Sequence, residues 1–169
     1  MNNMLIHQKI VKEILEQYKN KPNIIGVRLV GSVSRGEERP NSDVDIEVVK
    51  SKGNTWKYTE FVRHGIDIDF VTATKNHLIY QFENYPYLCY IDLDKKILYD
   101  PTNILKDLQN KVRVYMNANP KVKKFWDTEF KKMRLAKSKG IKQKSLIKMF
   151  DEAEVLFSKN HKINRNYFR

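Results

Sequence analysis

Residues 31–45 read GSVSRGEERPNSDVD, a glycine-serine turn followed after ten residues by two aspartates one position apart. Alternate residues of a strand point to the same side, so we expect Asp43 and Asp45 to present their carboxylates to one point in space. Two hard-oxygen ligands placed in this way suit Mg²⁺. The stretch therefore predicts a site that binds a nucleoside triphosphate and its metal ions.

The glycine-serine turn follows a short apolar, β-branched run at residues 24–30, which predicts a buried strand. A turn and a short helix are expected next. Gly31 lets the backbone approach a ligand closely, Ser32 supplies a hydroxyl donor, and the first amides of the helix face the phosphates. Arg35 adds a charge-assisted bond to a phosphate oxygen. The chain then turns back into a second strand at residues 43–49.

A third carboxylate is expected from residues 65–71, which read GIDIDFV. Strict alternation places Asp67 and Asp69 on one face of a strand. Aspartates are unfavourable in strands and like charges on one face repel, so a bound cation explains the pair better than chance does. The alternative is an exposed strand face that carries acids without a ligand. On the residues alone, both aspartates qualify as the third ligand.

The ordered set Gly31-Ser32, Arg35-Gly36 and Ser42-Asp43-Val44-Asp45 resembles the signature of the nucleotidyltransferase superfamily. That superfamily includes DNA polymerase beta, antibiotic nucleotidyltransferases and the minimal nucleotidyltransferases. The resemblance covers residues 24–100, and the stretch 97–100 looks most like the kanamycin nucleotidyltransferase type. It implies an α+β fold with a mixed sheet, a nucleoside triphosphate substrate such as ATP, and Ser42 among the nucleotide-binding residues.

The resemblance also implies a mechanism. Asp43 and Asp45 would bridge two Mg²⁺ ions that hold the triphosphate, and a third carboxylate would complete the site of the ion that activates the acceptor hydroxyl. The residues after Asp69 look like the family's strand exit, which favours Asp69 over Asp67 as that third catalytic ligand. The acceptor attacks the α-phosphorus in line and pyrophosphate leaves. Such chemistry depends on positioning and charge neutralisation and needs no nucleophilic side chain.

Three further residues lie near the expected site. Glu47 shares the strand face of Asp43 and Asp45, and it is either a general base or, as we favour, a solvated strand acid. Trp56 and Tyr58 precede the third-carboxylate strand. They line a base or acceptor pocket, or at least one of them packs in the core.

Length and composition limit the organisation. A chain of 169 residues accommodates one core, or one α/β domain with a helical appendage. We expect a catalytic domain at residues 1–105 and a basic helical segment at 106–169. The single Cys89 is expected to be a buried small hydrophobe, which fits a reducing compartment. The four histidines, which show no metal-ligand spacing, are expected at the surface or in turns: His7, His64, His77 and His161.

No apolar run approaches about 18 residues, and the N-terminus does not resemble a signal peptide. We therefore expect no membrane association and a cytoplasmic location.

The positive charge is concentrated in the C-terminal segment. Residues 1–105 contain 14 basic and 14 acidic residues, whereas residues 106–169 contain 18 and 6. Such a field would attract an RNA, a nucleotide or an acidic partner. The alternative is a set of solvated helix faces. A basic flank would also repel a polycationic aminoglycoside unless the acidic cleft dominates locally.

Hydrophobic periodicity predicts the order of the elements. The expected elements are a helix at 4–19, strands at 24–30, 43–49, 55–62 and 66–73, a helix at 75–84, a short strand at 88–91, a strand at 97–99, three helices between 101 and 157, and a frayed tail at 160–169.

Two functional classes remain open from the sequence. The first is an enzyme that transfers a nucleoside monophosphate to a hydroxyl of a small molecule, an RNA or a protein. The second is a non-catalytic or regulatory nucleotide-binding member, such as a toxin–antitoxin component. The intact motif and a third acid favour the enzyme. The resemblance favours an antibiotic acceptor, whereas the basic helices favour RNA or protein, and a homodimer is one way to complete the acceptor site.

Overall fold

A computed structural model describes residues 3–53, 56–142 and 144–158. Its elements, in chain order, are α1 (Asn3–Lys19), β1 (Ile24–Val30), α2 (Gly31–Arg35), β2 (Val44–Lys50), β3 (Lys57–Arg63), β4 (Ile66–Thr74), α3 (Lys75–Asn84), the 3-10 helix η1 (Pro86–Leu93), β5 (Lys96–Tyr99), α4 (Ile104–Ala118), α5 (Pro120–Ser138) and α6 (Leu146–Phe157).

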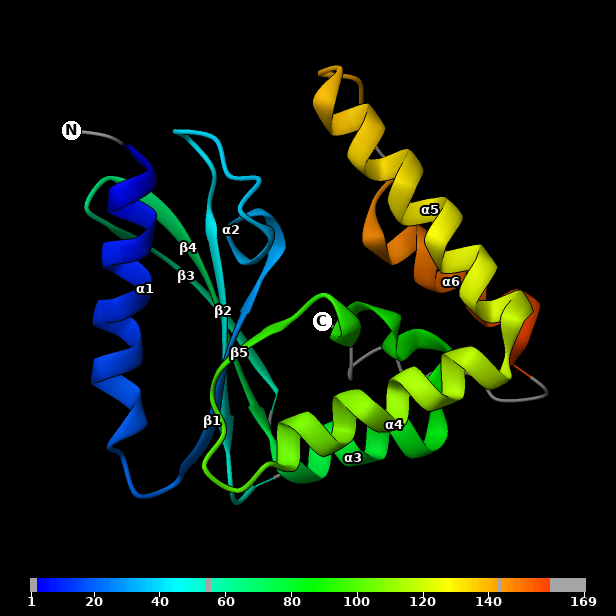
Figure 1. The fold of residues 1–169 in the computed structure, drawn as a ribbon, viewed down its shortest axis with the longest axis horizontal. Coiled ribbons are helices and arrows are strands. Elements are labelled where there is room, and N and C mark those ends of the chain that lie inside the picture. The colour runs from blue at the N-terminus through cyan, green and yellow to red at the C-terminus, as the bar shows by residue number, and fades with distance from the viewer. Residues whose placement is uncertain (1–2, 54–55, 143, 159–169) are drawn as a thin grey trace.

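The five strands form one mixed sheet in the order β3-β4-β2-β1-β5, which confirms the predicted α+β class. The central pair β2–β4 is parallel, and the other neighbouring pairs are antiparallel. Helix α1 covers one face of the sheet, and the helices that follow β4 lie on the other side (Figure 1). The sheet therefore separates the N-terminal helix from the C-terminal helices.

The face of the sheet toward α1 forms an apolar core. Ile10 and Ile14 of α1 pack with alternate strand residues such as Val44, Ile46 and Ile68, all of them buried. Burial of each such side chain stabilises the fold by about 1.5–3 kcal/mol. Because side chains alternate along a strand, this packing directs Asp45 and Glu47 to the opposite face.

The opposite face is covered by helices. Val49 and Ala73 of the sheet pack against Leu78 of α3 and against Leu105 and Leu108 of α4. Helices α5 and α6 pack further out, onto η1, through a second cluster that includes Trp126, Phe130, Met149, Leu88 and Tyr90. The C-terminal segment therefore reaches the sheet through α4 and η1.

The predicted strand at residues 88–91 is wrong, because this segment belongs to the 3-10 helix η1. Pro86 stands at the start of this helix, where its missing N–H costs no hydrogen bond. The side chains of Tyr87, Leu88, Cys89 and Tyr90 are all buried, so buried and exposed positions do not alternate along this segment. The other predicted helices and strands are present, with small shifts at their ends, and the tail at 160–169 lies outside the described residues.

Within the described ranges, none of the helices is both long and apolar enough to cross a lipid bilayer.

Candidate active site

Three carboxylates converge on the sheet face opposite α1. Asp43, Asp45 and Asp69 each offer an oxygen, and these oxygens all lie within 4.8 Å of one another. The parallel register of β2 and β4 pairs Asp45 directly with Asp69, and Asp43 precedes β2 by one residue. Oxygen atoms arranged in this way fit a divalent cation such as Mg²⁺.

Asp67 does not belong to this cluster. It lies two residues before Asp69 on β4, is exposed, and lines the cavity next to the three acids. The structure thus brings Asp43 and Asp45 together with one of the two predicted candidates, Asp69.

The crowding of the carboxylates shows in the pKa of Asp45. Burial, the nearby charges of Asp43 and Asp69, and a hydrogen bond with Asp69 raise this pKa to about 7. In the protein without metal, a proton thus relieves the repulsion between the acids near neutral pH. A bound cation would take over that role.

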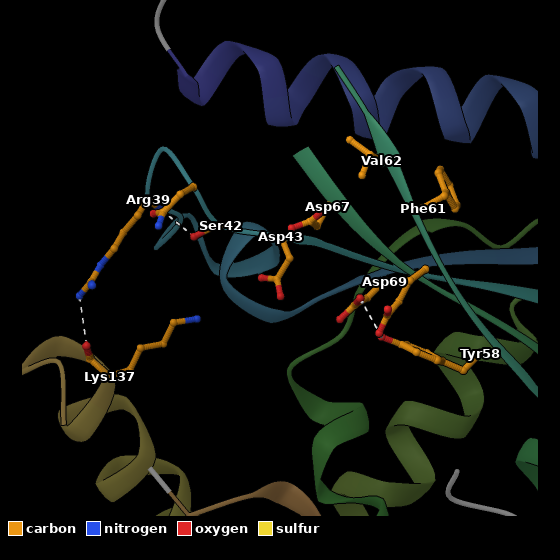
Figure 2. A pocket seen from close by; sticks show the side chains of 11 residues that line it. Arg39, Ser42, Asp43, Tyr58, Phe61, Val62, Asp67, Asp69 and Lys137 are labelled. Atoms are coloured by element: carbon orange, nitrogen blue, oxygen red, sulfur yellow. Dashed lines mark hydrogen bonds between the residues drawn. The ribbon is translucent and has the colours of Figure 1, made fainter. Parts of the chain in front are cut away.

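Tyr58 of β3 holds Asp69 in place. Its hydroxyl donates a hydrogen bond to Asp69 Oδ1 at 2.9 Å and also contacts Glu60 (Figure 2). The hydrogen bonds with both acids raise the pKa of Tyr58, so the hydroxyl keeps its proton. Sequence reasoning placed Tyr58 near a pocket but did not identify this contact, because it depends on the antiparallel pairing of β3 with β4.

The glycine-serine turn lies directly beside the acids. Gly31 has a φ of +72°, and a Cβ at this position would lie 2.1 Å from Asp45 Oδ2. The following residue, Ser32, is 5% exposed. Its Oγ has no hydrogen-bond partner among the described residues. A buried hydroxyl usually has a partner, and a phosphate oxygen would satisfy this one.

The loop that carries Asp43 is fixed by two hydrogen bonds at Ser42. The Ser42 Oγ accepts from the backbone N–H of Arg39 at 2.8 Å, and His7 Nε2 donates to the Ser42 carbonyl at 2.8 Å. The hydroxyl of Ser42 is therefore engaged within the loop. His7 and His77 are buried, so the expectation that they lie at the surface or in turns is wrong.

Arg35 lies at the end of α2, and its Nε donates to Glu37 Oε2 at 2.7 Å. This hydrogen bond lowers the pKa of Glu37. Arg35 and Ser32, the two side chains predicted to bind phosphate, line the same cavity.

Glu47 is not the solvated strand acid that we favoured. It is 4% exposed and pairs with the guanidinium of Arg28, with an Nη2–Oε2 distance of 2.5 Å. Asp92 and Lys95 complete a group of two acids and two cations, of which Lys95 is partly buried and the other three are buried. Burial alone would raise the pKa of Glu47, but Arg28 and Lys95 hold it below its usual value.

Two cavities adjoin the acids. The larger, of about 710 Å³, is lined by Asp43 and Asp69 together with Asp67, Glu60 and Lys137 (Figure 2). The smaller, of about 270 Å³, reaches Asp45 and Asp69 and is lined mainly by apolar side chains. These include Trp56, Tyr58, Leu88, Ile91, Leu146 and Phe150. Trp56 and Tyr58 therefore both line a cavity that reaches the acidic cluster, and Trp56 also packs against the core.

Comparison with known proteins gives one family match. Residues 8–131 match the family model described as the nucleotidyltransferase domain. A search of curated proteins found no match.

Solved structures that are similar to this chain include the following three. A nucleotidyltransferase-like protein from Exiguobacterium sibiricum 255-15 is 12% identical, with a TM-score of 0.49, covering 96% of this chain and 71% of that one. A spectinomycin adenyltransferase from Enterococcus faecialis, solved with ATP and spectinomycin, is 17% identical with a TM-score of 0.42, covering 96% and 94%. A toxin-antitoxin structure with AMP-PNP is 18% identical with a TM-score of 0.39, covering 72% and 96%.

Proposed function

Because this chain belongs to the nucleotidyltransferase domain family, we propose that it moves a nucleoside monophosphate from a nucleoside triphosphate to a hydroxyl acceptor in a Mg²⁺-dependent reaction. Pyrophosphate is released, and ATP is the first nucleotide to test. The observation that carries the proposal is the cluster of Asp43, Asp45 and Asp69 beside the hydroxyl of Ser32, which has no partner within the ranges that the structure describes.

The metal-binding roles follow from this cluster. Asp43 and Asp45 would hold two Mg²⁺ ions, and Asp69 would complete the site nearest the acceptor. Ions bound there would lower the pKa of the attacking hydroxyl and neutralise charge on the α-phosphate. The donor set supports this assignment because it consists of carboxylate oxygens alone, which are the ligands that Mg²⁺ prefers.

The other residues of the site position the reactants. Gly31 allows the backbone to pass close to Asp45, and Ser32 donates to a phosphate oxygen. Tyr58 keeps Asp69 oriented toward the acceptor. Positioning of this kind accounts for much of the rate in phosphoryl transfer, because the reaction needs no covalent step on the protein.

The cavity of about 710 Å³ is the acceptor site in this proposal. Its volume lies within the range of about 300–1,000 Å³ that is typical of small-molecule sites. Asp43 and Asp69 form part of its wall, so an acceptor hydroxyl at the metal site can leave the rest of the molecule in the cavity. Glu60 and Asp67 add negative charge, which favours a cationic small molecule such as an aminoglycoside over an RNA.

The test is a mass-shift screen of candidate acceptors, each incubated with one nucleoside triphosphate and Mg²⁺. Wild-type protein should add a nucleoside monophosphate to one acceptor and release one pyrophosphate. Asp43→Asn should stop both events, whereas Glu83→Gln, which removes an exposed acid on α3, should leave them unchanged. If wild type and Asp43→Asn both bind nucleotide but neither releases pyrophosphate with any acceptor, the chain is a non-catalytic or regulatory member, such as a toxin–antitoxin component.

An RNA acceptor has a separate signature. Phosphate contacts make binding fall steeply as salt rises. Binding of an RNA oligonucleotide at low salt, lost steeply at higher salt, would move the acceptor assignment from small molecules to RNA.

A further inference from the structure

A cavity of about 310 Å³ adjoins Ser32 on the α2 side and is rich in positive charge. Four cationic side chains line it: Arg35, Arg39, Arg134 and Lys137. Glu37 is the one acid in its described lining, and it is already paired with Arg35. The cavity therefore has a net positive charge next to a buried hydroxyl that lacks a hydrogen-bond partner in the described part of the chain.

Half of these cations come from α5, about a hundred residues after the glycine-serine turn. Arg39 Nη2 donates to the backbone carbonyl of Lys137 at 3.3 Å, which joins the motif loop to the end of α5. The side chain of Lys137 extends from α5 toward Asp43 (Figure 2). Lys137 thus lies at the boundary between the basic cavity and the cavity that holds the acids, and it lines both.

We propose that Arg134 and Lys137 of α5, together with Arg39, bind the β- and γ-phosphates of the nucleoside triphosphate opposite Ser32. This inference rests on the proposed function, because it takes the acidic cluster as the position of the α-phosphate. Guanidinium and ammonium groups form strong charge-assisted bonds with phosphate oxygens. The C-terminal segment then completes the nucleotide site within the same chain.

The arrangement also indicates on which side of the α-phosphorus the acceptor and the leaving pyrophosphate lie. In-line displacement requires the acceptor and the leaving pyrophosphate to lie on opposite sides of the α-phosphorus. The basic cavity suits the leaving pyrophosphate, and the cavity of about 710 Å³ lies beside Asp69 on the β3–β4 side. Arg134 and Lys137 act as positioning residues that also hold the charge of the leaving group. Phosphate binding by these two residues explains part of the excess positive charge of residues 106–169 without requiring an RNA partner.

The test is isothermal titration calorimetry of the full chain with ATP, AMP and inorganic tripolyphosphate, each with Mg²⁺. Arg134→Gln and Lys137→Gln should each weaken binding of ATP and of tripolyphosphate about tenfold, because each removes a charge-assisted hydrogen bond. Both should leave AMP binding unchanged. Lys131→Gln is the matched control: it removes one charge from the same helix, but Lys131 lines a different cavity. It should change none of the three affinities.

The outcomes separate this inference from the proposed function. Suppose that the double variant Arg134→Gln/Lys137→Gln binds ATP as tightly as wild type does, while Ser32→Ala binds ATP more weakly. In that case α5 does not bind the phosphates, and the proposed function stands. The same conclusion follows if the double variant loses binding of a single-stranded RNA oligonucleotide but keeps that of ATP. If wild type binds neither ATP nor tripolyphosphate, both ideas fail. Lys131, Arg134 and Lys137 are exposed and Ser32 is buried, and unchanged melting temperatures will show that the variants fold.

Discussion

The backbone of Gly31 lies against the carboxylate of Asp45, so closely that a Cβ at position 31 would meet Asp45 Oδ2 at 2.1 Å. Glycine at this position therefore serves the acidic cluster as well as the turn. Any larger residue must displace the carboxylate that β2 presents at the centre of the site.

Gly31→Ala should abolish transfer and Mg²⁺ binding, because the added methyl group pushes Asp45 away from Asp43 and Asp69. Gly36→Ala is the matched control, since Gly36 also has a positive φ but has no atom within 4 Å of an added Cβ. Gly36→Ala should lower the free energy of unfolding by about 1–2 kcal/mol from backbone strain alone and keep Mg²⁺ binding. Melting curves with and without Mg²⁺ measure both effects. Equal loss of Mg²⁺ binding in the two variants would contradict the steric explanation.

Asp69→Asn and Asp67→Asn should have very different effects, although both remove one acid from the same face of β4. Loss of partners that only orient metal ligands typically costs 10–100-fold in affinity or activity, so loss of Asp69, which we propose as a metal ligand, should cost more than about 100-fold in the transfer rate. Asp67→Asn should retain most of the rate. Pyrophosphate release at saturating ATP distinguishes them, and the reverse order of effects would assign the third ligand to Asp67.

Without metal, the protein should lose stability as the pH rises toward and through about 7. The folded state raises the pKa of Asp45 from 3.8 to about 7, so between these values it retains a proton that the unfolded chain releases, and each increase in pH favours unfolding. Mg²⁺ should therefore raise the melting temperature more at pH 8 than at pH 6, where the proton competes with it.

Melting curves in EDTA and in Mg²⁺ at the two pH values measure this dependence. Asp45→Asn should raise the melting temperature in EDTA at pH 8 and remove the response to Mg²⁺. A metal-free wild-type protein that is more stable at pH 8 than at pH 6 would contradict this assignment.

Glu47→Gln should lower the free energy of unfolding by about 3–5 kcal/mol, because it leaves the buried Arg28 and the partly buried Lys95 with one acid between them. Urea denaturation measures the change, with Glu83→Gln on the exposed face of α3 expected within about 0.5 kcal/mol of wild type. If Glu47 were a general base, Glu47→Gln would stop transfer and leave the unfolding curve in place.

The family resemblance of the motif predicts the mixed sheet, and the alternation of side chains predicts the shared face of Asp43 and Asp45. They could not decide between Asp67 and Asp69, because both lie on that face. The geometry depends on the register of β2 against β4, which is set by packing across the sheet. A pattern with a period of two residues does not contain that information.

Other features depended on contacts between distant segments. Glu47 carries the same local pattern as a solvated acid, and only its partner Arg28 on β1 makes it a buried ion pair. In the same way, the sequence showed that residues 106–169 are basic but not that Arg134 and Lys137 lie beside Ser32. The apolar run in η1 resembles a strand in sequence, because a short segment that is buried on all sides has no hydrophobic periodicity that distinguishes a helix from a strand.

The register of β4 has a further consequence for folding. A slip of two residues along β2 would keep every side chain on its own face, yet it would exchange Asp67 for Asp69 beside Asp45. A chain misaligned in this way would keep its strands intact but would place the wrong carboxylate in the acidic cluster. Such a slip would also shift Ala73 and Leu78, which follow Asp69 along the chain, relative to Val49 of β2 in their shared apolar cluster. Such a misaligned form would have the same circular dichroism spectrum as the native protein. It would be detected as folded protein that fails to bind the cation.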